Sequence, residues 1–451
     1  MKRANAGLTF MQECMETIDR IRQDNAELTP LNHFLNLAVK WHAEFEKTHQ
    51  SNADEELSVS RKARSGRTPI VVVLGTSVPE QLLYAFDTPP LFVTGGSHQS
   101  CAWSDDVLPR DSDPVSRSIL GYAIRLSERT DILPLFIVPI TNDNMRKIAY
   151  YLSDIGQQVF SINIPPNKDN ALCEKAFIRS ISDMVEAVSS HLKKSFTASE
   201  LRKSDELVSR AKALMVKLRS AAAYNPAITD EAVLIVLNSY YYTNDLQGWI
   251  SNLELLISLL EVKARRETVR IRPSLNEAAA GSSAVNRAHA PKVLVIGSSV
   301  LFPAYKVPEL VAACGLSIHQ CVDSVSPCES VCLDEGCRGS ASSMVKQIAR
   351  KYMLHDASAA YVVNECLERN IKQLIASGEV EGVICHILKG HIEYDFELNR
   401  MESVFDDADI PVFRLETDYQ YQDLEQLRIR LEAFGEMLNQ RRIVRARAAS
   451  A

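Results

Sequence analysis

The sequence predicts an α/β protein with two Rossmann- or flavodoxin-like parallel-sheet domains joined by a helical segment. Continuous apolar runs, of the kind that is buried on both faces of a parallel sheet, occur in both halves of the chain. Each run ends at a polar tip and is followed by a helical pattern, which is typical of parallel α/β sheets. The arrangement at residues 69–77 returns at 291–299, with a purely helical stretch between them. We therefore expect two similar domains.

Length and charge narrow the class of protein. The chain has 451 residues, too many for one ordinary core, and its 46% hydrophobic and 24% charged residues are typical of a globular protein. The net charge of −7 argues against nucleic acid as a partner. The sequence contains neither an apolar run of membrane-spanning length nor the apolar core of a signal peptide, so we expect a cytoplasmic protein without a membrane partner. Its ten cysteines are expected to be free thiols.

The first half of the chain divides into a helical segment and an α/β domain. Residues 1–67 form the N-terminal helical segment and a linker, because apolar residues recur at helical spacing between Leu31 and Trp41 and a polar stretch follows. The first α/β domain covers 68–197. Its expected strands are 69–75, 91–94, 133–138 and 159–164, and its expected helices lie near 80–86, 114–128, 143–155 and 169–192.

The second half begins with helices and ends with another α/β domain. Residues 198–271 have a purely helical pattern and form the helical connection. Residues 272–290 are rich in Ala, Ser and Asn without periodicity, which predicts a flexible linker. The second α/β domain covers 291–440, with clear strands at 291–297, 382–388 and 410–415, and a basic tail follows at 441–451.

Polar side chains follow several predicted strands at their carboxyl ends, where ligands bind in parallel sheets. Ser77 and Ser298 lie at the two Gly-Ser tips, His391 follows the strand at 382–388, and Glu416 and Asp418 follow the strand at 410–415. The two serines, Glu416 and Asp418 are candidates for substrate binding. The Gly-Ser tips match no nucleotide-binding fingerprint, so an ordinary strand-to-helix turn is the competing interpretation. For 416–418 the competing interpretation is a helix cap.

Several sequence segments, taken together and in their order along the chain, point to a particular protein family. Together they resemble the 2-hydroxyacyl-CoA dehydratase and benzoyl-CoA reductase family, from about residue 69 to 438. The resemblance is strongest near the C-terminus. The segments are Leu108-Pro-Arg110 with Pro114, Asp334-Glu-Gly-Cys-Arg-Gly339, Ala349-Arg-Lys-Tyr352, Glu381-Gly-Val-Ile384, Leu388-Lys-Gly-His391 before Tyr394, Leu415-Glu-Thr-Asp-Tyr419, Gln426-Leu-Arg-Ile-Arg430 and Glu432-Ala-Phe-Gly-Glu-Met-Leu438.

The resemblance implies a cofactor and partners. Members of the family are heterodimers of two related subunits with flavodoxin-like domains, and they carry a [4Fe-4S] cluster on three cysteines. An ATP-dependent activator protein delivers one electron to the complex. That electron converts the acyl-CoA substrate into a ketyl radical, from which water is eliminated.

This chain departs from the family at all three cluster positions. The first cysteine is replaced by Asp113, the second falls near Ala357 or Ala359, and the third is replaced by His391. Cluster iron prefers thiolate ligands, so a [4Fe-4S] cluster is not expected on these residues. The sequence therefore predicts a cluster-free dehydratase-type subunit, which shapes an acyl-CoA site together with a cluster-bearing homologous subunit.

Two alternatives remain open. In one, the chain is a metalloenzyme whose single Zn or Fe ion is held by Asp113, His391 and either His355 or Asp356, because one carboxylate and two imidazoles suit such an ion. In the other, the chain is an assembly or regulatory subunit with no chemistry and no cofactor of its own.

Overall fold

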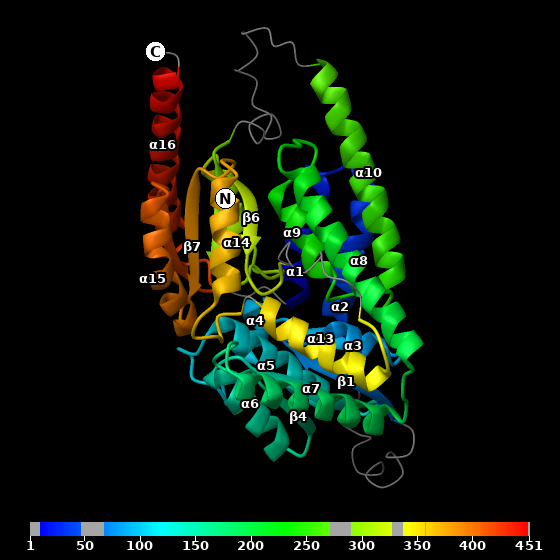
Figure 1. Cartoon of the computed structure of the whole chain (residues 1–451). Coiled ribbons are helices and arrows are strands. Elements are labelled where there is room, and N and C mark those ends of the chain that lie inside the picture. Colours follow the sequence, from blue (N-terminus) through cyan, green and yellow to red (C-terminus); the bar gives the residue numbers. More distant parts are fainter. Residues whose placement is uncertain (1–9, 47–66, 271–289, 327–336, 357, 450–451) are drawn as a thin grey trace.

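The structure, a computed structural model, describes residues 10–46, 67–270, 290–326, 337–356 and 358–449. It contains two four-stranded parallel sheets, which confirms the predicted fold class (Figure 1). The strand orders are β2-β1-β3-β4 and β6-β5-β7-β8, so the same topology occurs twice. The strands are β1 Thr68–Leu74, β2 Leu91–Val93, β3 Ile132–Ile140, β4 Gln158–Asn163, β5 Lys292–Gly297, β6 Ser317–Val322, β7 Gly382–Leu388 and β8 Val412–Thr417.

Most helices of the first domain begin at side-chain caps. Asp113, Asn142 and Asn170 each accept a hydrogen bond from a backbone N–H in the first turn of the helix that follows. Pro114 adds a fixed backbone angle at the first position of its helix. These local signals explain why the helices start where the sequence predicts. The helices are α3 Glu80–Tyr84, α4 His98–Ala102, α5 Pro114–Ser127, α6 Asp143–Asp154 and α7 Ala171–Leu192.

The N-terminal helices pack with the helical connection and form one layer beside the sheets (Figure 1). The Arg20 guanidinium lies 3.2 Å from the Glu231 carboxylate, and the Asn25 amide donates to Thr229 Oγ1 at 3.0 Å. Segments that are about 200 residues apart in the sequence are thus joined by direct polar contacts. The helices of this layer are α1 Phe10–Asp24, α2 Leu31–Glu46, α8 Ala198–Ala222, α9 Asp230–Ser239 and α10 Leu246–Arg270.

One helix of the second domain packs against the first domain. α13 contacts α7 and α8, and the rings of Phe177 and Tyr352 stack with centroids 6.3 Å apart. The loop after α13 also contacts the first domain, because Val362 N–H donates to the carbonyl of Pro166 at 2.9 Å. These contacts of α13 and of the loop after it connect the second domain directly to the first. The helices of the second domain are α12 Lys306–Ala313, α13 Ala341–His355, α14 Glu365–Ala376, α15 Ile392–Asp407 and α16 Leu424–Ala449.

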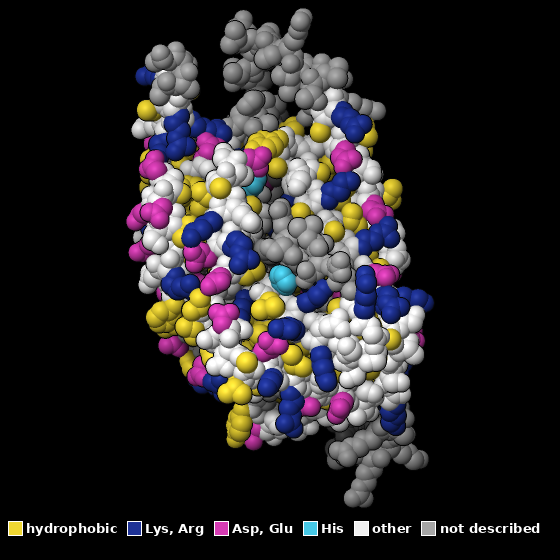
Figure 2. All heavy atoms as spheres, viewed as in Figure 1, with side chains coloured by type: hydrophobic (Ala, Val, Ile, Leu, Met, Phe, Trp, Pro, Cys, Tyr) yellow, Lys and Arg dark blue, Asp and Glu magenta, His cyan; other side chains and the backbone are white. Residues whose placement is uncertain are grey.

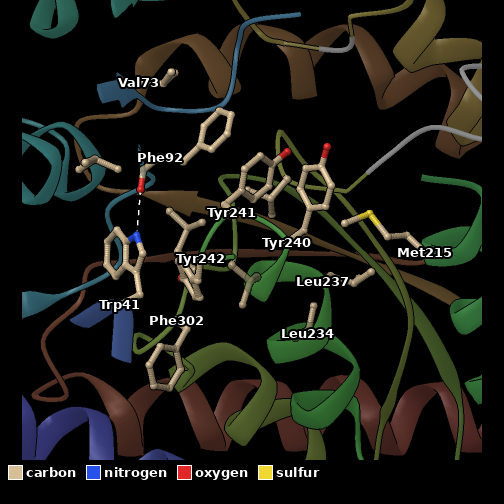
Figure 3. Packing of buried hydrophobic residues seen from close by; sticks show 14 of the residues in the cluster. Trp41, Val73, Phe92, Met215, Leu234, Leu237, Tyr240, Tyr241, Tyr242 and Phe302 are labelled. Carbon is tan, nitrogen blue, oxygen red and sulfur yellow. Dashed lines mark hydrogen bonds between the residues drawn. The ribbon is translucent and has the colours of Figure 1, made fainter. Parts of the chain in front are cut away.

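A buried aromatic cluster joins the helical layer to both domains (Figure 3). The Trp41 indole N–H donates to the carbonyl of Phe92 at 3.1 Å, and its ring centroid lies 4.7 Å from that of Tyr242. Phe302, from the loop after β5, packs edge-on against the His42 ring at 4.9 Å. Trp41, Phe92 and Phe302 are all at most 4% exposed. The hydrophobic core is therefore continuous across the domain boundary.

Two predicted boundaries differ from the structure. β8 extends to Thr417, so Glu416 belongs to the strand and lies with its side chain exposed instead of following the strand. α16 continues to Ala449, so residues 441–449 of the predicted basic tail extend the last helix, where Arg442 pairs with Glu381 at 2.7 Å. The predicted linker at 272–290 lies outside the described residues except for Ala290.

The helices, cysteines and surface charges also bear on the predictions made from composition. Every helix in the described ranges is too short or too polar to cross a bilayer. The eight cysteines in those ranges are present as thiols, as predicted. On the face shown in Figure 2, Lys and Arg side chains are interspersed with Asp and Glu.

Candidate functional site

The carboxyl ends of both sheets face one inter-domain pocket, which encloses about 680 Å³ when the solvent space at its open mouth is counted. Its walls include the residues after β1 and β3 and those after β5 and β7, which are the points where the strand order of each sheet reverses. Ligands of open α/β sheets bind at such points. Hydroxyl groups dominate the polar part of the wall and come from both domains: Thr76, Ser77, Thr94, Ser116, Thr141, Ser299, Ser324 and Ser358.

His391 projects into this pocket from the end of β7. Its Nδ1 lies 3.1 Å from Ser298 Oγ, which also accepts from the N–H of Leu388 at 3.0 Å. Its Nε2 faces two carboxylates, Asp113 Oδ1 at 3.8 Å and Glu393 Oε1 at 3.5 Å. A serine hydroxyl can either donate or accept, so Ser298 can hold the imidazole in either tautomer. The ring is thus positioned by both domains.

Asp113 is fully buried opposite this histidine, at the N-cap of α5. Its Oδ1 accepts from the Ser116 N–H at 2.7 Å, and its Oδ2 accepts from the Asn144 amide at 2.8 Å. Both oxygens therefore have protein donors, which offsets the cost of burying the carboxylate.

The two tips that carry Asp113 and His391 touch through their backbones. Gly390 has a φ of +84°, and a Cβ at this position would lie 2.7 Å from the carbonyl oxygen of Asp111 and 2.9 Å from the nitrogen of Asp113. A side chain does not fit without moving one of the two backbones. Glycine at this position therefore allows the close approach of the tips.

The other predicted ligand positions are divided between the pocket and its surroundings. Ala359 lines the pocket, whereas Ala357 lies outside the described residues. His355 ends α13, and its Nδ1 hydrogen-bonds with the carbonyl of Lys351 at 2.8 Å. Asp356 follows it and accepts from the N–H of Ser358 at 3.0 Å, and burial raises the pKa of its carboxyl group. Neither His355 nor Asp356 lines the inter-domain pocket.

The arrangement of donors bears on metal binding. Across the described ranges, no group of three or more His, Cys, Asp or Glu side chains has a geometry suited to a metal ion. The structure places Asp113 beside His391, and His391 shares the pocket wall with Ala359, whereas His355 and Asp356 lie outside that wall.

The four predicted substrate-binding residues lie in different places. Ser77 lines the inter-domain pocket, and Ser298 lies behind His391 with only 1% of its surface exposed. Glu416 is on the exposed face of β8. Asp418 lines a separate recess of about 710 Å³, where it pairs with Lys389 at 3.2 Å. The helix-cap interpretation of 416–418 is wrong, because α16 begins later, at Leu424.

Three residues of the pocket were missed by the sequence analysis. Asn142, at the end of β3, donates from its amide to Glu393 Oε1 at 2.8 Å and so links the first domain to α15. Tyr394 packs its ring edge-on against His391, with centroids 4.9 Å apart. The rule that polar residues follow parallel strands would have found Asn142. Glu393 gave no comparable signal, because its partner Asn142 comes from the other domain. Tyr394 stands in a segment that carries the family resemblance, but its ring contact with His391 was not predicted.

Comparisons with known proteins agree with this geometry. Residues 76–438 match the family described as 2-hydroxyglutaryl-CoA dehydratase, D-component. The chain is also 23% identical over 381 residues to the Escherichia coli (strain K12) protein named "Putative dehydratase subunit YjiM", covering 82% of this chain and 91% of that protein. The family match spans most of the chain, from just after β1 to α16, and includes the second sheet and most of the residues that line the pocket. The chain therefore belongs to the 2-hydroxyglutaryl-CoA dehydratase D-component family.

Proposed function

We propose that this chain is a cluster-free subunit of an acyl-CoA dehydratase complex. It provides an acyl-CoA pocket and works with a homologous subunit that carries the iron–sulfur cluster, on which an ATP-dependent activator acts. The observation that carries the proposal is the position of Asp113 beside His391, which lines the inter-domain pocket, in a member of the D-component family.

The residues present do not fit a [4Fe-4S] cluster. Such clusters are held by thiolates, and the three positions that the family resemblance assigns to cysteine hold a carboxylate, an alanine and an imidazole. Both Asp113 oxygens are already engaged by Ser116 and Asn144. The closely packed backbones of Gly390 and Asp113 further support the loss of this site.

The pocket instead suits a neutral, hydrogen-bonding group. Its walls in the described part of the chain supply serine and threonine hydroxyls and the Asn142 amide, and they contain no Lys or Arg. A thioester carbonyl or a 2-hydroxyl group can accept from or donate to such groups without needing a counter-charge. The role of this chain is then to bind and orient the acyl end of the substrate.

A partner subunit is implied by the family, and the chain offers a surface for it beside the pocket. Ile392 and Phe396 lie one helical turn apart at the start of α15 and are 64% and 69% exposed. Burying two such side chains against a partner stabilises an interface by about 3–5 kcal/mol. Their position next to His391 would place a partner subunit at the mouth of the site.

The test is to co-express the full chain with a cluster-bearing homologue and to measure co-purification and acyl-CoA binding by calorimetry. We expect a stable complex that binds an acyl-CoA thioester. Phe396→Glu should weaken the complex, whereas Leu172→Glu should not. Leu172 is a matched control because it is 75% exposed on α7, which belongs to the first domain. Failure of the chain to bind any acyl-CoA, alone or in the complex, would contradict the proposal.

The same preparation distinguishes the alternatives. Stoichiometric Zn or Fe without sulfide, lost in both His391→Ala and Asp113→Ala, would favour the mononuclear metalloenzyme. A stable complex in which this chain contributes nothing to acyl-CoA binding would favour an assembly or regulatory subunit.

A further inference from the structure

A second, smaller cavity lies behind the inter-domain pocket. It lies between the second sheet and helices α14 and α15, and its enclosed part is small, with room for about one water molecule. We call it the apolar cavity, because most of its wall is made by Ile296, Val322, Leu367, Ile371, Leu398 and Met401.

Tyr394 separates the two spaces. It lines both of them, and neighbouring residues in the chain line opposite sides: Asp323 faces the apolar cavity and Ser324 the inter-domain pocket. The edge-on contact with His391, at 4.9 Å between centroids, holds the phenol ring next to the site. The ring is therefore a wall that closes the inter-domain pocket on this side.

The charges around both spaces disfavour a second carboxylate on the ligand. Glu393 lines the pocket, and Asp323 and Glu397 line the cavity, whereas no Lys or Arg lines either one in the described ranges. Glu397 is 4% exposed; its Oε1 lies 3.7 Å from Arg400, and its Oε2 has no hydrogen-bond partner among the described residues. The terminal carboxylate of an acyl chain would lie near one of these acidic side chains, and no Lys or Arg of the described walls would compensate its charge. Burying it there would therefore be unfavourable.

We propose that this chain binds thioesters of short, uncharged acyl groups, and that Tyr394 sets the limit on their length. This inference rests on the proposed function as an acyl-CoA-binding subunit. The proposed ligand differs from 2-hydroxyglutaryl-CoA, the substrate in the family's name, because the 2-hydroxyglutaryl group ends in a carboxylate. Tyr394 is a specificity-determining residue because the apolar cavity behind it becomes available to the ligand once the ring is removed.

The test measures the affinity of the full-length chain for butyryl-CoA, pentanoyl-CoA, hexanoyl-CoA and glutaryl-CoA. The wild-type chain should bind hexanoyl-CoA no more tightly than butyryl-CoA. Tyr394→Ala should improve the affinity for hexanoyl-CoA relative to butyryl-CoA by about sixteenfold, because each of the two additional methylenes contributes about fourfold once it is buried. Tyr394→Phe keeps the wall and should keep the wild-type ratio. Adding Met401→Phe to Tyr394→Ala refills the cavity and should cancel the gain.

Each result has a defined meaning. An unchanged hexanoyl-to-butyryl ratio in Tyr394→Ala would overturn the role of Tyr394, while the proposed function would stand. In the wild-type chain, glutaryl-CoA should bind at least tenfold more weakly than the similarly sized pentanoyl-CoA. Equal or tighter binding of glutaryl-CoA would overturn the preference for uncharged chains, and this comparison needs no variant that must fold. Absence of binding to all four thioesters, both by the chain alone and in the complex, would overturn this inference and the proposed function together.

Discussion

The close contact between Gly390, after β7, and residues 111–113, before α5, makes a quantitative prediction for Gly390→Ala. An alanine at φ +84° carries the cost of a left-handed backbone, about 1–2 kcal/mol. Its Cβ would also lie 2.7 Å from the carbonyl oxygen of Asp111 and 2.9 Å from the nitrogen of Asp113, so one of the two backbones must move. Overpacking of this kind costs about 1–3 kcal/mol. We therefore expect a total destabilisation of about 2–5 kcal/mol.

Gly378→Ala is the matched control. Gly378 has a φ of +75°, and nothing lies within 4 Å of the position its Cβ would take. This substitution carries the backbone cost alone. At about 2 °C per kcal/mol for a large chain, the melting temperature should fall by about 2–4 °C in Gly378→Ala and by about 4–10 °C in Gly390→Ala.

The assay is calorimetric melting of both variants, together with hydrogen exchange of the backbone amides at 111–117. Exchange there should accelerate in Gly390→Ala and stay at the wild-type rate in Gly378→Ala, because only the first substitution pushes the tips apart. Equal melting temperatures and equal exchange in the two variants would refute the close approach of the tips.

Three further predictions concern buried polar groups. Asp113→Ala removes the cap of α5 and the acceptor of the Asn144 amide, so the free energy of unfolding in urea should fall by about 2–4 kcal/mol. Asp113→Asn should keep most of the stability that the alanine variant loses. Burial raises the pKa of Glu231 from 4.5 to about 7, so the free energy of unfolding should fall as pH rises from about 4.5 to 7, and Glu231→Gln should flatten that slope. Lys306→Met removes a buried ammonium 2.7 Å from Asp423, so limited proteolysis should cut residues 418–423 faster than in the wild-type chain.

Much of the fold could be predicted because its central strands are continuous apolar runs. The predicted strands at 69–75, 291–297 and 382–388 correspond to β1, β5 and β7 within one residue. The edge strand β8 was displaced by two residues, because its alternating burial gives no apolar run to mark its end. The central strands could thus be predicted because they are buried on both faces and are therefore apolar along their whole length.

The docking of α13 on the first domain could not be predicted. Its amphipathic pattern shows that one face is buried, but the partner of that face depends on how the two domains are arranged. The same holds for the N-terminal helices, whose contacts with α9 join distant parts of the sequence.

The candidate site was partly accessible from the sequence. The family resemblance indicated Asp113 and His391 as site residues. In the structure His391 Nε2 lies 3.8 Å from Asp113 Oδ1. Their supporting contacts were not accessible, because Asn142 reaches Glu393 and Asn144 reaches Asp113 only once the sheets are oriented and packed. The mononuclear metal hypothesis treated His355 as a neighbour of His391, but His355 ends α13 and does not line the pocket.

The content of iron and acid-labile sulfide tests the central claim most directly. The full chain should be purified alone under strictly anaerobic conditions and again in complex with a cluster-bearing homologue. We expect far less than one cluster per chain in the isolated protein and one cluster per heterodimer, contributed by the partner, in the complex. About four irons and four sulfides in the isolated chain would contradict it.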